Sequence, residues 1–377
     1  MASSSKKNTI KLEYKNTLVN FSSSIMKYYG SPVEYPTHAL TDYLLSKKYR
    51  HVAVILLDGL GYNIVEENAS NGSILKTHQI MKLNSVYPPT TAAATTSLLT
   101  GKAPIETGWL GWHEYLSEDD PSVVLFKNEI YKTGEAFEKY QVEDKIGVEK
   151  FYNKVKRAQT YTIYPSWSKE NPVNSFDEAL LKLNENLNKD EANFTYLYWD
   201  EPDKSIHEYG TSSPVIKFLL QDYEAKIRDF GENLPDNSIV FVLADHGLID
   251  CELFDINDYP LFKDTLRKDI SGEARFTSFY LKDGKEKEFE DLFVENFGEH
   301  FNLYKRDELI KSKLCGINKP HELVNIVLGD YVAIAKSNYA FVDGIKEDTF
   351  KAFHAGFTKD ELEVPVIMFK RKDIVLE

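Results

Sequence analysis

HVAVILLD, at residues 51–58, is the stretch that says most about the fold of this chain. It is a short, uninterrupted apolar run with several β-branched residues, and it ends in Asp58. Such a run predicts a strand that is buried on both faces, as in a parallel sheet. Gly59 and Gly61 follow directly and suit a tight turn from this strand into a helix.

Three further segments have the same character, and polar residues follow two of them. They are NFTYLYW at 193–199, IVFVLA at 239–244 and VPVIMF at 364–369. Helix-like stretches, such as 214–230, lie between the strands. This alternation predicts an α/β fold with a mostly parallel central sheet flanked by helices. In such sheets the ligand site lies outside the carboxyl ends of the strands.

The expected domain organisation is a single catalytic domain over residues 1–377 with one insertion. The stretch from about 268 to 345 interrupts the α/β alternation, because it combines an alternating strand at 275–281 with a charged amphipathic helix at 285–297. It is expected to form a small inserted α+β subdomain or cap. The first 45 or so residues are interpreted as a polar lead-in.

Composition limits the possible partners and the compartment. The formal net charge is −14, which disfavours duplex nucleic acid as a partner but leaves small anions possible. Residues 1–20 do not resemble a signal peptide, and no apolar run approaches the roughly 20 residues needed to cross a bilayer. Cys251 and Cys315 form no CxxC pair, which favours free thiols in a reducing compartment. The expectation is a cytoplasmic protein with no membrane partner.

Residues of metal-binding type occur where the predicted strands end and in one later loop. They are Asp58, Asp203, His207, Asp245, His246 and His354. Each alone has an ordinary alternative: an aspartate can cap a helix, an i,i+4 pair can lie on a helix surface, and a single histidine can be structural. In one α/β sheet, however, all of them would fall at a shared site. Carboxylates and imidazoles together suit zinc, with manganese as an alternative.

The candidate nucleophile lies in YPPTTAAA, residues 87–94. A helix is predicted at 92–99, with Gly101 as its C-terminal stop. Thr91 would then stand at the helix N-terminus, where the helix dipole favours an attacking alkoxide and an incoming phosphate. A threonine hydroxyl needs a metal or a base to ionise it. The alternative is an ordinary threonine N-cap.

Together these motifs resemble a known family. The segments VILLDGLG, PPTTAAATTSLLTG, DEPDKSIHEYG, VLADHG and FHAGFTKDELEVPVI are similar to those of the alkaline phosphatase superfamily, and most similar to its type I phosphodiesterase/nucleotide pyrophosphatase branch. They occur in the family's order and span residues 52–368. The resemblance implies an alkaline-phosphatase-like fold and a hydrolase that cleaves phosphodiester or pyrophosphate bonds of nucleotide-like substrates.

The resemblance also implies a role for each site residue. The family pattern places its nucleophile ten residues before the glycine of a Thr-Gly element, which selects Thr91 and not Thr90. One divalent metal would take Asp58, Thr91, Asp245 and His246. The second would take Asp203, His207 and His354. The implied reaction passes through a phospho-threonine intermediate, with two zinc ions as the most favoured cofactors.

Other activities of the superfamily fit these residues less well. A sulfatase needs a C/S-x-P-x-R element, and a mutase carries a serine nucleophile, so neither fits Thr91. A phosphomonoesterase often uses an arginine for the extra phosphate charge. No arginine lies between Arg50 and Arg157, although Arg275 or Lys127 could reach the site.

Several alternatives stay open. Ala94, three residues after Thr91, offers no side-chain donor to a phosphate oxygen, so the Ala92 backbone N–H is a candidate, and the preference for a diester over a monoester is undecided. A phosphonate hydrolase is a further alternative. A catalytically dead binding module is disfavoured, because every metal-site residue has the right type.

Aromatic residues follow the nucleophile helix and are candidates for a substrate wall. Trp109 and Trp112, with Tyr115 nearby, could stack against a nucleobase, since every base has a π-face. The alternative for all three is core packing.

Overall fold

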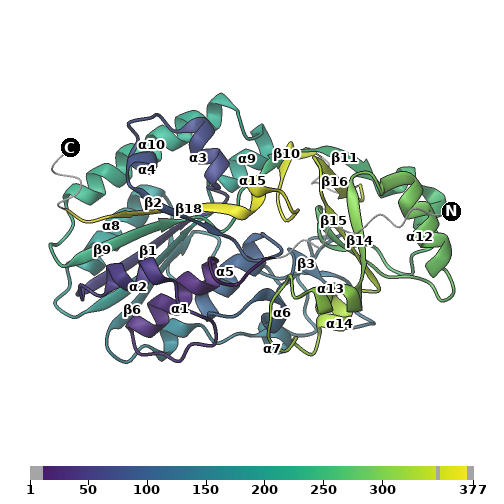
Figure 1. Cartoon of the computed structure of the whole chain (residues 1–377), viewed down its shortest axis with the longest axis horizontal. Coiled ribbons are helices and arrows are strands. Elements are labelled where there is room, and N and C mark those ends of the chain that lie inside the picture. The colour runs from purple at the N-terminus through teal and green to yellow at the C-terminus, as the bar shows by residue number, and fades with distance from the viewer. Residues whose placement is uncertain (1–11, 345–348, 372–377) are drawn as a thin grey trace.

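The computed structural model describes residues 12–344 and 349–371. Two sheet-containing regions lie side by side along the long axis of the molecule (Figure 1). The larger region holds the predicted α/β sheet, and the smaller holds most of the stretch 268–345. Residues 1–11 of the expected lead-in lie outside the described residues.

A seven-stranded sheet forms the centre of the larger region, in the order β2-β18-β9-β1-β8-β6-β7. β1 pairs in parallel with both β8 and β9, while β18 runs antiparallel to β9 and β2. The mostly parallel α/β sheet predicted from the sequence is therefore confirmed. Its strands are β1 (His51–Leu57), β2 (Gln79–Asn84), β6 (Gln159–Pro165), β7 (Pro172–Val173), β8 (Asn193–Trp199), β9 (Ser238–Leu243) and β18 (Glu363–Phe369).

Helices cover both faces of this sheet (Figure 1). On one face lie α1 (Leu18–Tyr28), α2 (Ala39–Leu45) and α5 (Thr91–Thr100); on the other lie α3 (Tyr62–Asn68), α4 (Ile74–Thr77), α8 (Phe176–Leu187) and α10 (Pro214–Glu232). The helix predicted at 92–99 is confirmed as α5, and Gly101 ends it in a left-handed conformation.

The interpretation of the first 45 residues as a polar lead-in was wrong for the described part. α1 and α2 pack within the fold, and Leu18, Phe21 and Ile25 of α1 are buried in the core. Three consecutive serines in α1 concealed this apolar face. They are buried as well, and Ser22 donates a hydrogen bond to the Leu98 carbonyl oxygen (2.6 Å) on α5.

A second seven-stranded sheet, in the order β14-β15-β13-β12-β3-β4-β5, forms the smaller region. Its described pairings are antiparallel. The strands are β3 (His113–Glu114), β4 (Val123–Val124), β5 (Glu129–Ile130), β12 (Ser271–Glu273), β13 (Phe276–Phe279), β14 (Phe301–Lys305) and β15 (Tyr331–Ala335). The stretch 268–345 thus supplies four strands of this sheet, and the segment 113–130 supplies three. We propose that this sheet is a subdomain of one catalytic domain.

Shorter elements complete the two regions. α12 (Glu286–Phe297) and α11 (Pro260–Lys263) pack phenylalanines into a core of the second sheet. Small two-stranded sheets pair β10 (Ile249–Asp250) with β17 (Ala352–Phe353), and β11 (Glu252–Asp255) with β16 (Tyr339–Val342). The remaining helices are α6 (Pro104–Thr107), α7 (Val142–Ile146), α9 (Asp203–Tyr209), α13 (Arg306–Ser312), α14 (Val324–Val327) and α15 (Lys359–Leu362), and 3-10 turns span Phe151–Lys154 and Ile256–Asp258.

Candidate metal centre and active site

The predicted ligands meet at the carboxyl edge of the central sheet. Asp58 directly follows β1, and Asp245 and His246 follow β9, the neighbouring strand. α9 begins at Asp203, four residues after β8 ends on the other side of β1. Because these three strands are parallel and adjacent, their polar ends come together, as the sequence predicted.

Gly59 allows two of these segments to approach closely. Its φ is +69°, and a Cβ at this position would lie 2.8 Å from the Asp203 Cα. The Asp203 backbone N–H donates to the Asp58 carbonyl oxygen (2.9 Å), which joins the start of α9 to the end of β1. A side chain at Gly59 would push these carboxylates apart.

The Thr91 side chain lies against two of the predicted ligands. Thr91 is the first residue of α5, and it is buried. Its Oγ1 lies 3.2 Å and 3.3 Å from the two Asp58 carboxylate oxygens and 3.1 Å from His246 Nε2. A hydroxyl at this place can lose its proton to a base, and the helix dipole and a bound cation would both stabilise the resulting alkoxide.

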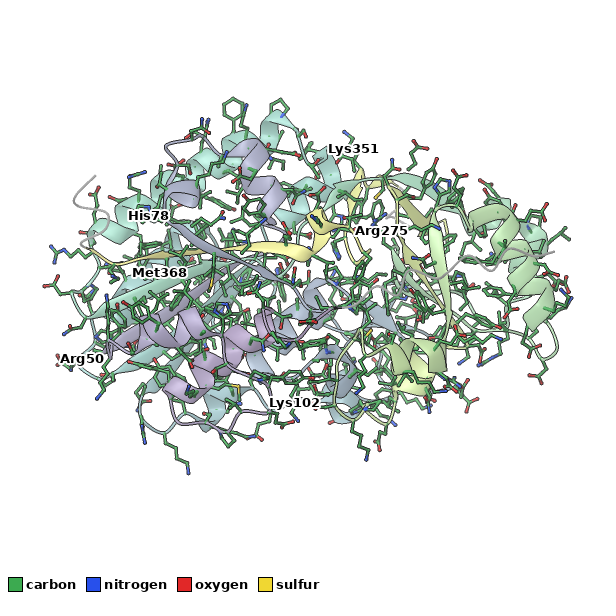
Figure 2. The ribbon with its side chains drawn as sticks, in the orientation of Figure 1. Arg50, His78, Lys102, Arg275, Lys351 and Met368 are labelled. Atoms are coloured by element: carbon green, nitrogen blue, oxygen red, sulfur yellow. The ribbon has the colours of Figure 1, made fainter. Side chains whose placement is uncertain are left out.

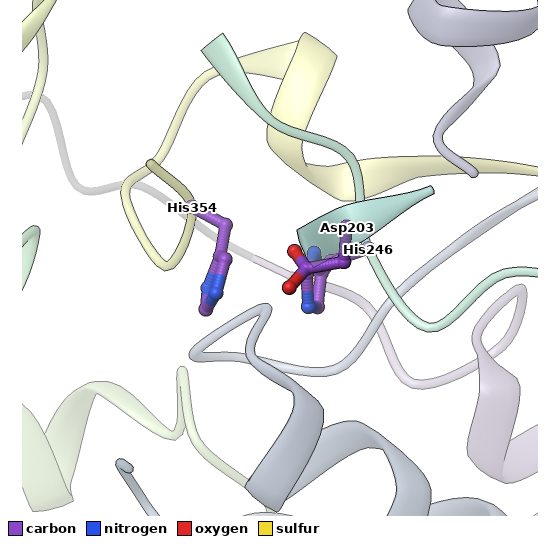
Figure 3. A group of neighbouring side chains, drawn as sticks. All are labelled: Asp203, His246 and His354. Atoms are coloured by element: carbon purple, nitrogen blue, oxygen red, sulfur yellow. The ribbon is translucent and has the colours of Figure 1, made fainter. Parts of the chain in front are cut away.

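Five of the predicted carboxylate and imidazole ligands form two overlapping groups. One contains Asp58, Asp245 and His246, and the other contains Asp203, His246 and His354. Within each group the potential ligand atoms lie within 4.8 Å of one another. Figure 3 shows the side chains of the second group approaching one another from three separate segments. His207 joins this group through Asp203, with its Nε2 3.3 Å from Oδ2.

Backbone carbonyl groups orient two of the histidine rings. His207 Nδ1 lies 2.7 Å from the Ala352 carbonyl oxygen, and His246 Nδ1 lies 3.2 Å from that of Gly247. A carbonyl oxygen can only accept, so each Nδ1 carries a proton, and the Nε2 atom of each ring faces the carboxylates, where it could ligate a cation. This arrangement is typical of metal-ligating histidines.

Unsatisfied buried oxygens show that the site fits a cation. Among the described residues, Asp203 Oδ1 and Asp245 Oδ2 are buried and have no hydrogen-bond partner. A buried carboxylate oxygen without a partner is costly, and a bound cation would remove that cost. The donor set of carboxylate oxygens and imidazole nitrogens is suitable for zinc.

The pKa shifts reflect the crowding of buried acids. Burial raises the pKa of Asp58, and the nearby Asp245 and Asp203 raise it further. Burial also raises the pKa of Asp245, although His246 opposes this. Burial alone would raise the pKa of Asp203, but His207 and His354 outweigh it and hold that pKa below its usual range. A divalent cation would favour the ionised form of all three acids.

Two of the three aromatic residues predicted to form a substrate wall are buried. Trp109 is buried, and its indole N–H donates to the Ile146 carbonyl oxygen (2.7 Å), so it packs in the core. Tyr115 is buried beside Tyr280. Trp112 is half-buried, and its backbone N–H donates to the Gly272 carbonyl oxygen (3.1 Å) on β12. Trp112 is therefore the one of these three residues whose side chain is not fully buried.

Arg275 does not reach the site. Its side chain is fully buried between the two regions (Figure 2) and donates to both Glu361 carboxylate oxygens, at 2.7 Å and 2.9 Å. It also donates to the carbonyl oxygens of Ser337 and Tyr339. The guanidinium is thus occupied, and the idea that it could hold a phosphate was wrong. Lys127 Nζ lies 5.9 Å from the centre of the Trp112 ring.

Several residues around the site could not be predicted from the sequence. The Tyr198 hydroxyl donates a short hydrogen bond to Asp58 Oδ2, and the Thr90 hydroxyl donates one to Glu273 Oε1. Trp167 is exposed, its indole N–H donates to Asp200 (2.9 Å), and its ring packs edge-on against Tyr198. Tyr198 lies in β8, whose residues are all buried, and Glu273 lies on a strand distant in the sequence, so no local pattern identified them.

Comparison with known proteins decides the family. The family model described as type I phosphodiesterase / nucleotide pyrophosphatase matches residues 52–358. The chain belongs to this family. The match includes the segments that hold Asp58, Thr91, Asp203, Asp245 and His354, and it confirms the resemblance drawn from the sequence.

Similar curated proteins match this member of the family only over short segments. Ectonucleotide pyrophosphatase/phosphodiesterase family member 5 from Homo sapiens is 22 % identical over 143 residues, which is 36 % of this chain and 29 % of that protein. A bis(5'-adenosyl)-triphosphatase from Pongo abelii is 36 % identical over 87 residues, or 20 % of this chain and 19 % of that protein. The chain therefore aligns with less than a third of either relative's length.

Solved structures share the fold over most of the chain. The murine ectonucleotide pyrophosphatase/phosphodiesterase 5 has a TM-score of 0.66 at 17 % identity, with 84 % of this chain and 87 % of that chain covered. A phosphonoacetate hydrolase from Sinorhizobium meliloti has a TM-score of 0.61 at 16 % identity, with 85 % and 90 % covered. These likenesses confirm the alkaline-phosphatase-like α/β fold.

Proposed function

We propose that this protein is a metal-dependent hydrolase of phosphodiester or pyrophosphate bonds in nucleotide-like substrates, with Thr91 as its nucleophile. The observation that carries the proposal is the position of the Thr91 hydroxyl. It lies in the first turn of a helix and within 3.3 Å of Asp58 and His246, two residues of metal-ligand type. Membership of the type I phosphodiesterase family supports this chemistry.

Two divalent ions, most favourably zinc with manganese as the alternative, fit the donor groups. Asp58, Thr91, Asp245 and His246 would hold one, and Asp203, His207 and His354 would hold the other. When bound, the ions would lower the pKa of the Thr91 hydroxyl and stabilise charge on the attacking and leaving oxygens. The two groups of ligand atoms share His246, so they are close enough for such a pair, whose usual separation is about 4 Å.

The protein side of the reaction has two displacement steps. First, Thr91 Oγ1 gives up its proton and forms a bond to phosphorus while the bond to the leaving-group oxygen breaks and that oxygen takes up a proton, which gives phospho-Thr91. Then a water oxygen attacks phosphorus from the side opposite Thr91, the Thr91–phosphate bond breaks and a proton of the water restores the Thr91 hydroxyl. The product is a phosphate monoester, and the N–H groups of the first turn of α5, including Ala92, can donate to its oxygens.

Two similar proteins support a nucleotide substrate. The murine family member 5 has been solved in complex with AMP, in a variant named as inactive in which a threonine is replaced by alanine. The Pongo abelii relative is named as a bis(5'-adenosyl)-triphosphatase. The burial of Arg275 also disfavours a phosphomonoesterase, because this arginine cannot pair with a dianionic phosphate. A phosphonate hydrolase is the second candidate, supported by the fold of the phosphonoacetate hydrolase.

A substrate panel with controlled metal content tests the proposal. The protein is stripped with a chelator, reloaded with zinc or manganese, and analysed for bound ions. We expect about two ions per chain, turnover of diesters and dinucleoside polyphosphates above that of monoesters and phosphonoacetate, and loss of turnover on chelation. Asp203→Asn should lose both metal and activity. Activity without metal, or a clear preference for phosphonoacetate, would overturn the assignment.

We also propose a cytoplasmic location. Cys251 and Cys315 are both free thiols, which suits a reducing compartment. Over residues 12–344 and 349–371, none of the helices is long and apolar enough to cross a bilayer. Cell fractionation with an antibody against the native chain tests the location, and recovery with a membrane or secreted fraction would contradict it.

A further inference from the structure

Thr90 stands at the N-cap of α5 but does not cap the helix. Its backbone is extended (φ −140°, ψ 151°), as an N-cap requires, yet its side chain accepts no hydrogen bond from the first turn. Other helices of this chain are capped in the usual way: Ser175 accepts from the Glu178 N–H (3.1 Å) and Ser213 from the Val215 N–H (3.3 Å). In α5 the N-cap threonine does not take this role.

The Thr90 hydroxyl is instead turned toward the second sheet. It donates a short hydrogen bond to Glu273 Oε1, at the end of β12. β12 pairs with β3 at Gly272 and His113, and a Cβ on Gly111 would lie only 2.5 Å from the Gly272 Cα. Glu273 thus reaches from a paired strand to the residue directly before Thr91.

This contact leaves the first turn of α5 open to a ligand. The Ala94 N–H already bonds to the Thr90 carbonyl oxygen (2.8 Å), but the N–H groups before it have no carbonyl acceptor within the helix. A free threonine hydroxyl at the N-cap would normally accept from one of them. These N–H groups face the end of the helix at which Thr91 would carry its phosphoryl group.

We propose that Glu273 is a positioning residue that holds the Thr90 hydroxyl away from the α5 N-terminus, and so keeps the first-turn N–H groups free for the phosphate at Thr91. The inference rests on the proposed function for its ligand. Without Glu273, the Thr90 hydroxyl can rotate and cap its own helix, and the phosphate must then compete with it. Burial raises the pKa of Glu273 to about 8, although the Thr90 hydrogen bond opposes this, and either form can accept that hydrogen bond.

A double-mutant cycle tests this competition directly. The probe is inorganic phosphate, and its dissociation constant is measured by calorimetry on the metal-loaded protein. Glu273→Ala should weaken phosphate binding about fivefold, the usual value of one helix cap. Glu273→Gln should bind as the wild type does, because its amide oxygen accepts the same hydrogen bond. Thr90→Val in the Glu273→Ala background should restore binding to within about twofold of the wild type.

Amide hydrogen exchange gives a readout that needs no activity. In Glu273→Ala, exchange of the first-turn amides of α5 should slow, and Thr90→Val should reverse this. Unchanged exchange in Glu273→Ala, or a double variant that binds phosphate as weakly as Glu273→Ala, would overturn the proposal. A wild-type protein that neither binds phosphate nor hydrolyses the substrate panel would instead refute the proposed function, and the exchange experiment would still decide the role of Glu273.

Discussion

Replacing Arg275 by methionine should destabilise the protein by about 3 kcal/mol, at the low end of the about 3–5 kcal/mol measured for breaking a buried ion pair. The side chain is fully buried and joins the second sheet to Glu361 in α15. The low end is expected because Glu361 keeps other donors, namely the N–H groups of Gly356 and Thr358 and the Thr358 hydroxyl. Methionine has a similar length and leaves little cavity.

Glu361→Gln should cost more, nearer 5 kcal/mol, because it leaves the buried Arg275 charge without a counter-ion. At about 2.1 cal/mol/K per residue, 377 residues give an unfolding entropy of roughly 0.8 kcal/mol/K near the midpoint. The two substitutions should therefore lower Tm by about 4 °C and about 6 °C respectively. The double variant should lose clearly less than the sum, since the two residues form one interaction.

Urea unfolding with linear extrapolation measures these differences. Lys287→Met is the matched control, because Lys287 pairs with Asp291 at 2.8 Å while its side chain is 86 % exposed; it should cause no measurable change. A loss below about 1 kcal/mol in Arg275→Met, or strict additivity in the double variant, would refute the view that this pair joins the two regions.

Two further predictions concern the site itself. The pKa of Asp58 is raised by burial and by Asp245 and Asp203, so as the pH rises above about 3.9 the unfolded chain gives up this proton more readily than the native metal-free protein does, and stability falls. Asp58→Asn should thus raise the Tm of the metal-free protein at pH 7 and give a smaller gain toward pH 4, and a lower Tm at pH 7 would contradict this. Trp112→Ala should raise KM for nucleotide diesters about fivefold or more with little change in kcat, by loss of stacking. Trp109→Ala, the control, should lower stability by about 3–5 kcal/mol, and equal KM values in both variants would exclude Trp112 as a base-stacking residue.

The strand ends could be predicted because each strand is a continuous apolar run in the sequence, and the polar site residues follow the run directly or within a few positions. The apolar runs gave β1, β8, β9 and β18 to within a residue or so, and parallel pairing then brought Asp58, Asp203 and Asp245 to one edge. Thr91 was selected by its spacing from Gly101, and the structure places its hydroxyl beside Asp58 and His246.

Contacts that depend on tertiary structure could not be predicted. β3, β4 and β5 are each two residues long, too short to show any periodicity, so the contribution of 113–130 to the second sheet had no signal. Glu273 and Thr90 are 183 residues apart, and only the pairing of the two regions brings them together. The serines of α1 hid a buried face, because small side chains can pack in a core and the hydroxyls of Ser22 and Ser24 donate to the carbonyl oxygens of Leu98 and His38.

The role of Thr91 is tested most directly by the turnover of Thr91→Ala on a phosphodiester, at a metal content matched to the wild type. The six carboxylate and imidazole ligands remain in this variant, so it should still bind its metals. We expect kcat to fall by about three orders of magnitude or more, since the group that attacks phosphorus is gone. Thr91→Ser, which keeps a hydroxyl, should retain part of the activity. Turnover of Thr91→Ala within about tenfold of the wild type would contradict a phospho-threonine intermediate and would assign the attack to water.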